Sequence, residues 1–379
     1  MVEIQFKRLK TCLDKSFTEY INTKVFPGAA IGISVFNDGE FQRMKSCYGK
    51  KDDSDNYVDR NTLYDLASLT KPLVTVLSIL ALIEEKKIFW KEKLESLLSF
   101  AFPEEKKNIN LIQLMSHCSG LPAHRPYYKD LIRISDECRK NKIIDLIAHE
   151  DLVYEPGNGN MYSDLGYILL GNIIEERSGK RLDEFWRQKI VVPLLLQDKL
   201  FFPKNKEIKK TQFASTGCCS MMNKKLYGIV HDDNCRVLGG VAGHAGLFGT
   251  IDGVLSLCEN ILTGYNDQST HPSFSNDNLR IVLEKQKNSS WTLGFDTPSP
   301  AASSSGRYFS KLSVGHLGFT GTSFWIDLQR GVCIVFLSNR TFFDGENERF
   351  KKVRPIVHDS IMQELNNHRL QVGGFEIAD

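Results

Sequence analysis

NTLYDLASLTKPLVTVLSILALIEE, the segment from Asn61 to Glu85, contains the most apolar run of the chain. That run, Pro72–Ile83, is too short to span a bilayer, so we expect a helix buried in the core. Ser68 and Lys71 stand three residues apart at its start and therefore share one face of the helix. A serine in the first turn also lies at the positive end of the helix dipole, which favours its alkoxide.

Two later segments place polar groups beside glycine-rich loops. Tyr162-Ser163-Asp164 precedes a run with helical spacing, and GHLGFTG (Gly315–Gly321) stands just before an apolar strand. Each has a plain structural explanation on its own, because Ser163 or Asp164 suits a helix cap and His316 suits a core position. A Ser-x-x-Lys pattern is itself expected about once by chance in a chain of this size. Only the three elements together indicate a site.

The apolar pattern predicts strands at both ends of the chain and helices between them. Alternating runs flank Asp38-Gly39 and Arg330-Gly331, which is typical of two β-hairpins, Gly28–Gly49 and Thr322–Asn339. Helical spacing is found at the N-terminus, with Leu9, Leu13 and Phe17 near one face, and in residues 111–115, 163–177, 252–262 and 346–366. We therefore expect one antiparallel sheet built from both chain ends and flanked by helices, with a mainly helical second lobe.

Taken together, the three polar elements resemble the motifs of the serine β-lactamase and penicillin-binding-protein superfamily. The closest resemblance is to the branch of class C β-lactamases, D-alanyl-D-alanine carboxypeptidases and related esterases. There, Ser-x-x-Lys is followed by Tyr-x-Asn and by a Lys- or His-x-Gly strand motif. FPGAAIGISV, LMSHCSGLP and GGVAGHAGLF are also similar to that branch, so the resemblance runs from about Pro27 to Asn339.

The resemblance implies an α/β (α+β) fold of the β-lactamase/transpeptidase type, with one catalytic domain over residues 1–379. Its sheet lobe would comprise residues 1–66 and 308–369, and its helical lobe residues 67–307. It further implies that no metal or organic cofactor is needed. The implied catalytic residues are Ser68, Lys71, Tyr162 and His316, with Asp164 and Gly318 in support and the backbone N–H groups of Ser68 and Phe319 as the oxyanion hole.

Two positions depart from the branch. Asp164 stands where an asparagine is usual, and a carboxylate near Lys71 should raise the lysine pKa, so we expect Tyr162 to carry more of the base role. Leu317 stands where relatives commonly present a Lys or Thr to a substrate carboxylate, which is costly to bury without a partner. Esters or uncharged acyl groups are therefore the expected substrates, unless Thr320 or Thr322 supplies the missing hydroxyl.

The expected activity is that of a serine acyl hydrolase, a carboxylesterase or amidase acting on a small ester, amide or β-lactam-like substrate. A D-alanyl-D-alanine-type peptidase or β-lactamase stays open as an alternative, as does an acyltransferase, in which an alcohol replaces water. A catalytically silent penicillin-binding scaffold is a further alternative. The sequence does not indicate the oligomeric state.

The amino-acid composition indicates which binding partners and which cellular compartment to expect. Lys and Arg total 48 against 46 Asp and Glu in 379 residues, which gives no electrostatic reason to expect nucleic acid or an anionic membrane. Nine cysteines without a Cys-x-x-Cys pair are typical of free thiols in a reducing compartment. No apolar signal segment is seen near Met1, so the cytoplasm is expected. The run His231–Asp233 and His244 lack familiar metal-ligand spacing, and His244 is expected in a tight turn on the cleft wall.

Overall fold

The structure is a computed structural model that describes residues 2–204, 207–219, 221–287, 289–343 and 348–372. Its helices are α1 (Val2–Asn22), α2 (Leu77–Glu84), α3 (Leu94–Leu97), α4 (Glu104–Lys107), α5 (Leu111–Met115), α6 (Tyr128–Leu131), α7 (Asp136–Ala148), α8 (Asp164–Ser178), α9 (Leu182–Trp186), α10 (Asp233–Val237), α11 (Ile251–Tyr265), α12 (Asn276–Leu283) and α13 (Glu348–Val372). Its strands are β1 (Gly28–Asn37), β2 (Glu40–Gly49), β3 (Tyr64–Asp65), β4 (Leu200–Phe201), β5 (Cys218–Cys219), β6 (Lys224–Lys225), β7 (Phe248–Gly249), β8 (Ser313–Gly318), β9 (Thr322–Asp327) and β10 (Val332–Ser338).

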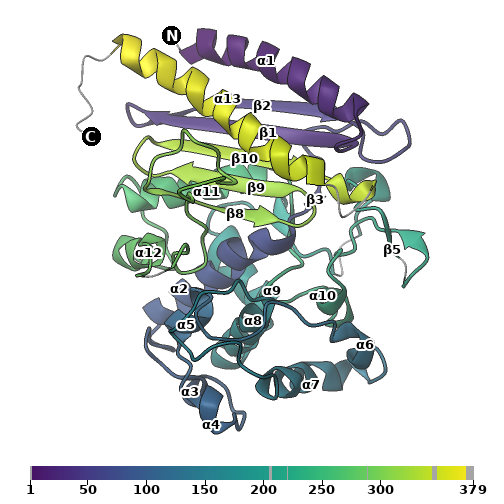
Figure 1. The fold of residues 1–379 in the computed structure, drawn as a ribbon, viewed down its shortest axis with the longest axis vertical. Helices are drawn as coiled ribbons and strands as arrows, with labels where there is room; N and C mark the ends of the chain where they lie inside the picture. The colour runs from purple at the N-terminus through teal and green to yellow at the C-terminus, as the bar shows by residue number, and fades with distance from the viewer. Residues whose placement is uncertain (1, 205–206, 220, 288, 344–347, 373–379) are drawn as a thin grey trace.

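Five strands form one antiparallel sheet in the order β2-β1-β10-β9-β8 (Figure 1). The two predicted hairpins are confirmed, and they join in the middle of the sheet, where Ala29 pairs with Ser338 and Val35 with Val332. The predicted sheet, built from both chain ends and flanked by helices, is therefore confirmed.

Residues of β1 alternate between two hydrophobic layers, as the period of a strand requires. Ala29, Ile31, Ile33 and Val35 belong to the cluster beneath α1 and α13. Gly32 faces the other way, and a Cβ added there would lie 3.1 Å from Ile251 of α11. The glycine therefore lets α11 approach the sheet closely.

A buried carboxylate fastens α11 to the sheet. Glu259 accepts hydrogen bonds from the Ser34 hydroxyl at 2.6 Å and from Arg43 Nε and Nη2 at 2.6 and 2.9 Å. The bidentate contact with Arg43 fixes both the orientation of α11 and its distance from the sheet. α11 lies within the range expected to form the helical lobe, yet it packs on β1 and β10. The lobe boundaries themselves stay a prediction.

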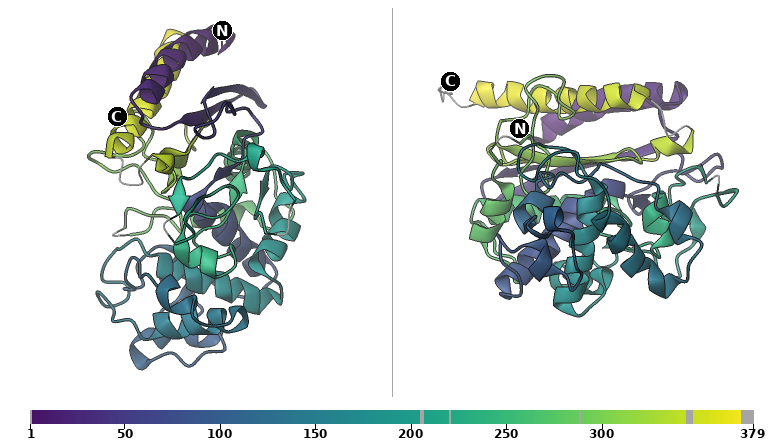
Figure 2. Two further views of the ribbon diagram at one scale, coloured as in Figure 1. Left: turned by 90° about the vertical axis from the view of Figure 1, so that its right-hand side faces the viewer. Right: turned by 60° about the horizontal axis from the view of Figure 1, so that its bottom comes forward.

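The two terminal helices, α1 and α13, lie side by side on the other face of the sheet (Figure 2). Phe17 of α1 is fully buried there, stacked on Tyr48 at 4.5 Å and tilted against Phe336 at 5.4 Å between ring centroids. The predicted amphipathic N-terminal helix is thus confirmed. So is a C-terminal helix, although residues 346 and 347 of its predicted range lie outside the described residues.

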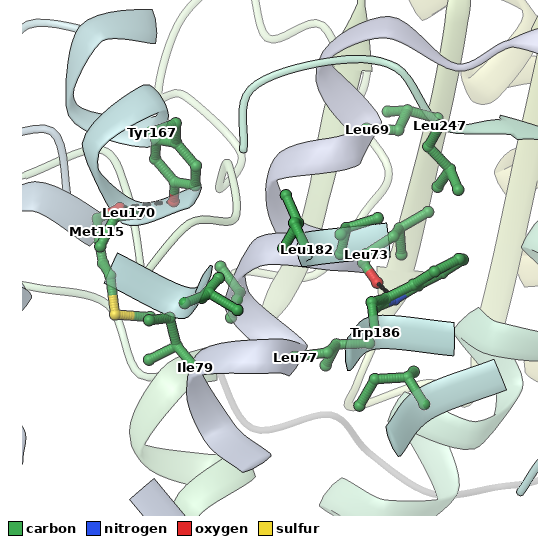
Figure 3. Packing of buried hydrophobic residues seen from close by; sticks show 14 of the residues in the cluster. Leu69, Leu73, Leu77, Ile79, Met115, Tyr167, Leu170, Leu182, Trp186 and Leu247 are labelled. Atoms are coloured by element: carbon green, nitrogen blue, oxygen red, sulfur yellow. Dashed lines mark hydrogen bonds between the residues drawn. The ribbon is translucent and has the colours of Figure 1, made fainter. Parts of the chain in front are cut away.

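The helix predicted from Pro72–Ile83 forms the centre of the second hydrophobic cluster (Figure 3). It begins with a π-helical segment, Lys71–Val76, and continues as α2. Trp186 of α9 donates its indole N–H to the Leu73 carbonyl at 2.8 Å, which ties α9 to this segment. In the described part of the chain, Ala67–Glu84 is the one helix apolar and long enough to cross a membrane, and 83% of it is buried inside the protein.

The segment Gly315–Gly321 precedes strand β9, as the sequence predicted. Its first residues lie in the edge strand β8, as a His-x-Gly strand motif implies, and His316 stands opposite Phe324 of β9. Gly315 exchanges two backbone hydrogen bonds with Asp296, so a distant segment completes the pairing. A local pattern rich in glycine carries no sign of that long-range partner.

Replacing Phe17 by alanine should lower the free energy of unfolding by about 3–5 kcal/mol, because the change leaves a cavity between α1 and the sheet. Equilibrium urea unfolding followed by circular dichroism measures the loss. Lys15, exposed on the same helix, is the control, and Lys15→Ala should change stability by less than about 0.5 kcal/mol. A loss below about 1 kcal/mol for Phe17→Ala would show that this layer is not tightly packed.

Candidate active site

Ser68 stands in a strained turn between β3 and the central helix. Its neighbour Ala67 has a φ of +47°, a left-handed conformation that costs a non-glycine residue about 1 kcal/mol or more. The Asp65 carboxylate holds this conformation by accepting the Ala67 N–H at 2.9 Å and the His231 N–H at 2.7 Å. The turn projects Ser68 into the cleft that lies beside it.

Lys71 is fully buried one turn further on. Its Nζ lies 3.0 Å from Ser68 Oγ, 2.7 Å from Asp164 Oδ1 and 3.2 Å from the His244 carbonyl oxygen. An ammonium has three N–H donors, and each has an oxygen in reach. The predicted pair Ser68 and Lys71 is therefore in direct contact.

Electrostatics at Lys71 favours the ammonium form. Burial is the largest single effect and opposes that charge, but Asp164 and Tyr162 together raise the pKa of Lys71 above its ordinary value. Burial likewise opposes the charge of Asp164, whose pKa nevertheless lies below its usual range because of Lys71 and a hydrogen bond from His124. The geometry therefore agrees with the raised lysine pKa that we expected from an aspartate at position 164.

Tyr162 covers the lysine. Its ring centroid lies 4.8 Å from Lys71 Nζ, and its other ring neighbours are His117 at 4.6 Å, Trp291 at 5.4 Å and His316 at 6.0 Å. Burial raises the pKa of the Tyr162 phenol, and the Lys71 charge offsets part of that rise. Both protonatable partners of Ser68 are therefore protonated in the resting site at neutral pH.

His316 forms the β8 side of the cleft as a neutral imidazole. Burial, with a contribution from Lys71, lowers its pKa to about 3. Nδ1 lies 2.9 Å from the Leu317 carbonyl oxygen, which assigns the proton to Nδ1. Nε2 is then an acceptor, and within the described residues it has no hydrogen-bond partner.

Strand β8 is fastened directly to the turn that carries Ser68. Thr320 donates its hydroxyl to the Asp65 carbonyl at 2.6 Å, and Thr322 donates to the Leu66 carbonyl at 3.1 Å. These are the two hydroxyls considered for a substrate carboxylate, and both serve the backbone instead. Gly318, the last residue of β8, lies against the second of these contacts: an added Cβ would come within 2.0 Å of Thr322 Oγ1 and 2.7 Å of the Leu66 carbonyl oxygen. The expected oxyanion-hole segment, Gly318 and Phe319, is held at a fixed distance from Ser68 as a result.

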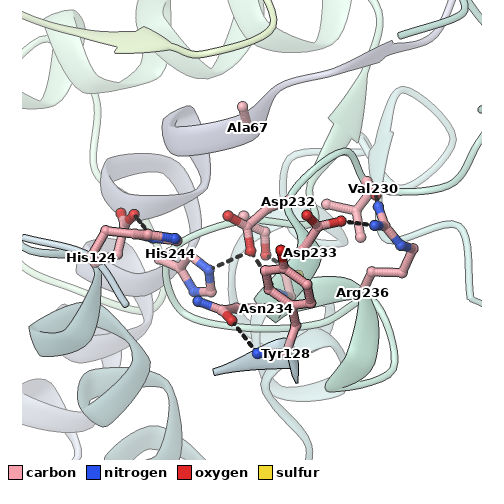
Figure 4. Close-up of polar contacts among 12 residues, drawn as sticks. Ala67, His124, Tyr128, Val230, Asp232, Asp233, Asn234, Arg236 and His244 are labelled. Carbon is pink, nitrogen blue, oxygen red and sulfur yellow. Dashed lines mark hydrogen bonds and ion pairs between the residues drawn. The ribbon is translucent and has the colours of Figure 1, made fainter. Parts of the chain in front are cut away.

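The opposite wall carries a second set of polar contacts (Figure 4). His244 Nε2 lies 2.9 Å from Asp232 Oδ1, and His124 Nδ1 lies 3.5 Å from Asp164 Oδ2. Asp233 contacts Arg236. In the ranges that the structure describes, no group of three or more His, Cys, Asp or Glu is arranged to hold a metal ion. The acidic groups of this wall therefore each have a cation or an imidazole as partner.

A cleft of about 840 Å³ lies beside these groups. The sequence-predicted residues that meet at it are Ser68, Tyr162, Asp164, His316, Gly318 and Phe319, with Lys71 buried directly behind Ser68. Trp291, Arg340 and Arg354 are among the lining residues that sequence reasoning missed. Arg340 stands two residues after the end of β10, and a cation just beyond a core strand is the one signal that pointed to it. The other two have no local motif.

Comparison with known proteins gives the class and then the family. The solved structure titled "EstCE1, a hydrolase with promiscuous acyltransferase activity" is 19% identical and matches with a TM-score of 0.72 over 95% of this chain and 100% of that chain, which shows a shared fold. The "N-acetylmuramyl-L-alanine amidase" of Bacillus subtilis (strain 168) is 31% identical over 83% of this chain and 77% of its own length. The "Putative D-alanyl-D-alanine carboxypeptidase" of Escherichia coli (strain K12) is 31% identical over 74% of this chain and 69% of its own length.

The fold and these relatives define the protein as a serine hydrolase. A model of the Beta-lactamase family matches residues 13–356, and the chain belongs to that family. The resemblance drawn from the three sequence motifs is thus confirmed, as is the expectation of an acyl hydrolase related to β-lactamases. The comparisons do not test the roles assigned to individual residues.

Replacing Asp164 by asparagine should move the alkaline rise of kcat/KM toward lower pH. Asp164 is the largest of the groups that raise the pKa of Lys71, and without its carboxylate the opposing effect of burial is less well offset, so the pKa should fall. A base that loses its proton at lower pH becomes active at lower pH. The measurement is a pH profile of kcat/KM with a neutral p-nitrophenyl ester.

Asp233→Asn is the matched control, because Asp233 lies on the same cleft but contacts Arg236. Its profile should coincide with that of the wild type. An Asp164→Asn profile unchanged in position would mean that Lys71 does not set the rise.

Proposed function

We propose that this protein hydrolyses small esters or amides through an acyl-enzyme formed on Ser68. The observation that carries the proposal is the contact between Ser68 Oγ and a fully buried Lys71 Nζ, 3.0 Å away, beside a cleft of about 840 Å³. A serine next to a lysine charge in a site shielded from water is the arrangement that activates a hydroxyl as a nucleophile.

In the proposed mechanism, the reactive form of the site is the one in which the Lys71–Tyr162 pair has released one proton to solvent. Ser68 Oγ then attacks the substrate carbonyl, and its proton fills the vacant position of the pair. Because Asp164 favours the ammonium form of Lys71, Tyr162 takes the larger share of the base role. The backbone N–H groups of Ser68 and Phe319 stabilise the oxyanion. Tyr162 then protonates the leaving group, and a water molecule that gives its proton to the same pair releases the acid.

His316 completes the proposed site as an acceptor. It is neutral at pH 7, and its unpaired Nε2 can accept a hydrogen bond from a substrate N–H or from the attacking water. An amide substrate offers such an N–H and an ester does not. The similarity to an amidase and to a carboxypeptidase supports amides as the physiological class.

Two alternatives remain as proposals of lower rank. An alcohol could replace water as the acyl acceptor, which the name of EstCE1 supports. A silent scaffold would have no need to keep Ser68, Lys71, Tyr162 and His316 in one place.

We also propose a reducing compartment such as the cytoplasm, because all nine cysteines are free thiols and three of them, Cys12, Cys138 and Cys218, are exposed.

A fluorophosphonate probe should add to the wild-type protein once, as read by intact mass, and Ser68→Ala should gain no mass. Ser304→Ala is the control, since Ser304 lines the same cleft away from the lysine, and it should label like the wild type. Labelling of Ser68→Ala at wild-type extent would place the nucleophile elsewhere.

Tyr162→Phe should lower kcat for a p-nitrophenyl ester by about 100-fold or more, with a smaller change in KM, because it removes the acid–base hydroxyl and keeps the ring. Tyr128→Phe, another cleft tyrosine, should stay within about threefold of the wild type. If Tyr162→Phe kept near-normal turnover while Lys71→Ala lost it, the proposed division of the proton work would be wrong.

A further inference from the structure

The turn that follows α5 holds His117 in a strained backbone conformation. Its φ is +60°, a left-handed value that a non-glycine residue rarely adopts. Only 1% of His117 is exposed, and it is not among the residues that line the cleft. Strain of this kind persists where the surrounding contacts hold the residue in place. The contacts of His117 therefore show what the strained turn serves.

His117 holds the main chain on both sides of Tyr162. The N–H of Met161 donates to the His117 carbonyl oxygen at 3.0 Å, and the N–H of Ser163 donates to His117 Nδ1 at 3.1 Å. The Tyr154 hydroxyl donates to the same carbonyl at 3.0 Å. The backbone is thus fixed by one residue immediately before Tyr162 and immediately after it.

The ring of His117 also packs against the ring of Tyr162. The two centroids lie 4.6 Å apart, and the planes are tilted by 38°. Trp291 at 5.4 Å and His316 at 6.0 Å are more distant ring neighbours of the tyrosine. The closest of the three rings thus belongs to the residue that also holds the tyrosine backbone.

His117 is a neutral imidazole. Burial lowers the pKa of His117 well below its ordinary value, and the charge of Lys71 lowers it further. Because Nδ1 accepts the N–H of Ser163, the proton of the neutral ring belongs to Nε2. His117 therefore contributes an acceptor and a ring surface to the site, and no charge.

The hydroxyl of Tyr162 has to meet two groups at once. Burial raises the pKa of Tyr162, while Lys71 and a hydrogen bond with Ser68 act in the opposite direction. In the proposed mechanism the same hydroxyl shares the proton of the nucleophile and protonates the leaving group. A displacement of about 1 Å in a reacting group can lower a rate about 100-fold, so the contacts that fix this ring matter for catalysis.

We propose that His117 is a positioning residue for Tyr162. Its carbonyl and Nδ1 fix the main chain of the tyrosine, and its ring fixes the phenol, so that the hydroxyl meets the nucleophile and the buried lysine. The inference rests on the proposed function of Tyr162 and adds to it a residue that does not contact the substrate.

The test is a double-mutant cycle between His117 and Tyr162, measured as kcat/KM for phenyl butyrate. His117→Asn keeps an acceptor in place of Nδ1 and tolerates a positive φ, but it removes the ring. It should lower kcat/KM about tenfold in the wild-type background. In the Tyr162→Phe background it should lower kcat/KM less than about twofold, because the hydroxyl that His117 positions is absent.

The dependence on the leaving group is a second readout. Tyr162 protonates the leaving group, and phenol needs that proton more than 4-nitrophenol does, because phenol is the weaker acid. The ratio of kcat/KM for 4-nitrophenyl butyrate to that for phenyl butyrate should therefore rise about threefold or more in His117→Asn. A residue that only stabilises the fold would lower both rates equally.

His271→Asn is the matched control. His271 is buried, its Nδ1 accepts the N–H of Ser273 at 3.1 Å, and its ring stacks on Phe274 at 4.3 Å. It is not among the residues that line the cleft. The variant should keep the leaving-group ratio within about twofold of the wild type, even where urea unfolding shows a loss of stability.

His117→Phe keeps a ring against Tyr162 and removes the acceptor for Ser163. It should show the same coupling to Tyr162, so either variant decides the outcome if the other does not fold. Equal losses with and without the Tyr162 hydroxyl would overturn the inference, as would an unchanged leaving-group ratio. If Tyr162→Phe alone leaves kcat/KM unchanged, the proposed proton role of Tyr162 fails, and the inference fails with it.

Discussion

Lys71 carries a positive charge with no exposed surface, and distant segments of the chain supply the groups that surround it. Transferring an ammonium from water costs several kcal/mol unless it is paired and hydrogen-bonded. Asp164 at the start of α8, the His244 carbonyl and the Ser68 hydroxyl meet that requirement together. The helical part of the molecule must therefore close around the central helix before the site exists. Ser68 receives its proton partner as a result of tertiary folding rather than of local sequence.

The sheet contributes the other half of the site by the same kind of constraint. Thr320, in the turn between β8 and β9, and Thr322, at the start of β9, reach across to the backbone of the turn that carries the nucleophile. The strained φ of Ala67 persists because Asp65 and these two hydroxyls hold the turn on both sides. The sheet and the helical part of the molecule thus meet at the short turn that carries Ser68. This contact limits how far the nucleophile can move relative to the oxyanion donors.

Sequence reasoning succeeded where the information is local. The hairpin around Asp38-Gly39 and the helix that carries Ser68 and Lys71 follow from turn chemistry and apolar period alone. It failed where a residue acts through a distant partner. Thr322 was considered for substrate binding, yet it faces the backbone. Arg354 was not considered at all, because nothing in a helical pattern shows which turn will border a cleft.

One feature of the sheet affects how the chain is made. β1 lies in the interior of the sheet, but its partner β10 is synthesised about 300 residues later, with Ala29 paired to Ser338. At ribosomal rates of about 5–20 residues per second, β1 waits roughly 15–60 s with one edge open. An open apolar edge is a template for pairing with other chains. During translation, only the hairpin β1–β2 and the helix α1 packed on it are available to shield the apolar residues of β1. The N-terminal helix therefore protects the nascent chain from aggregation in addition to its place in the folded protein.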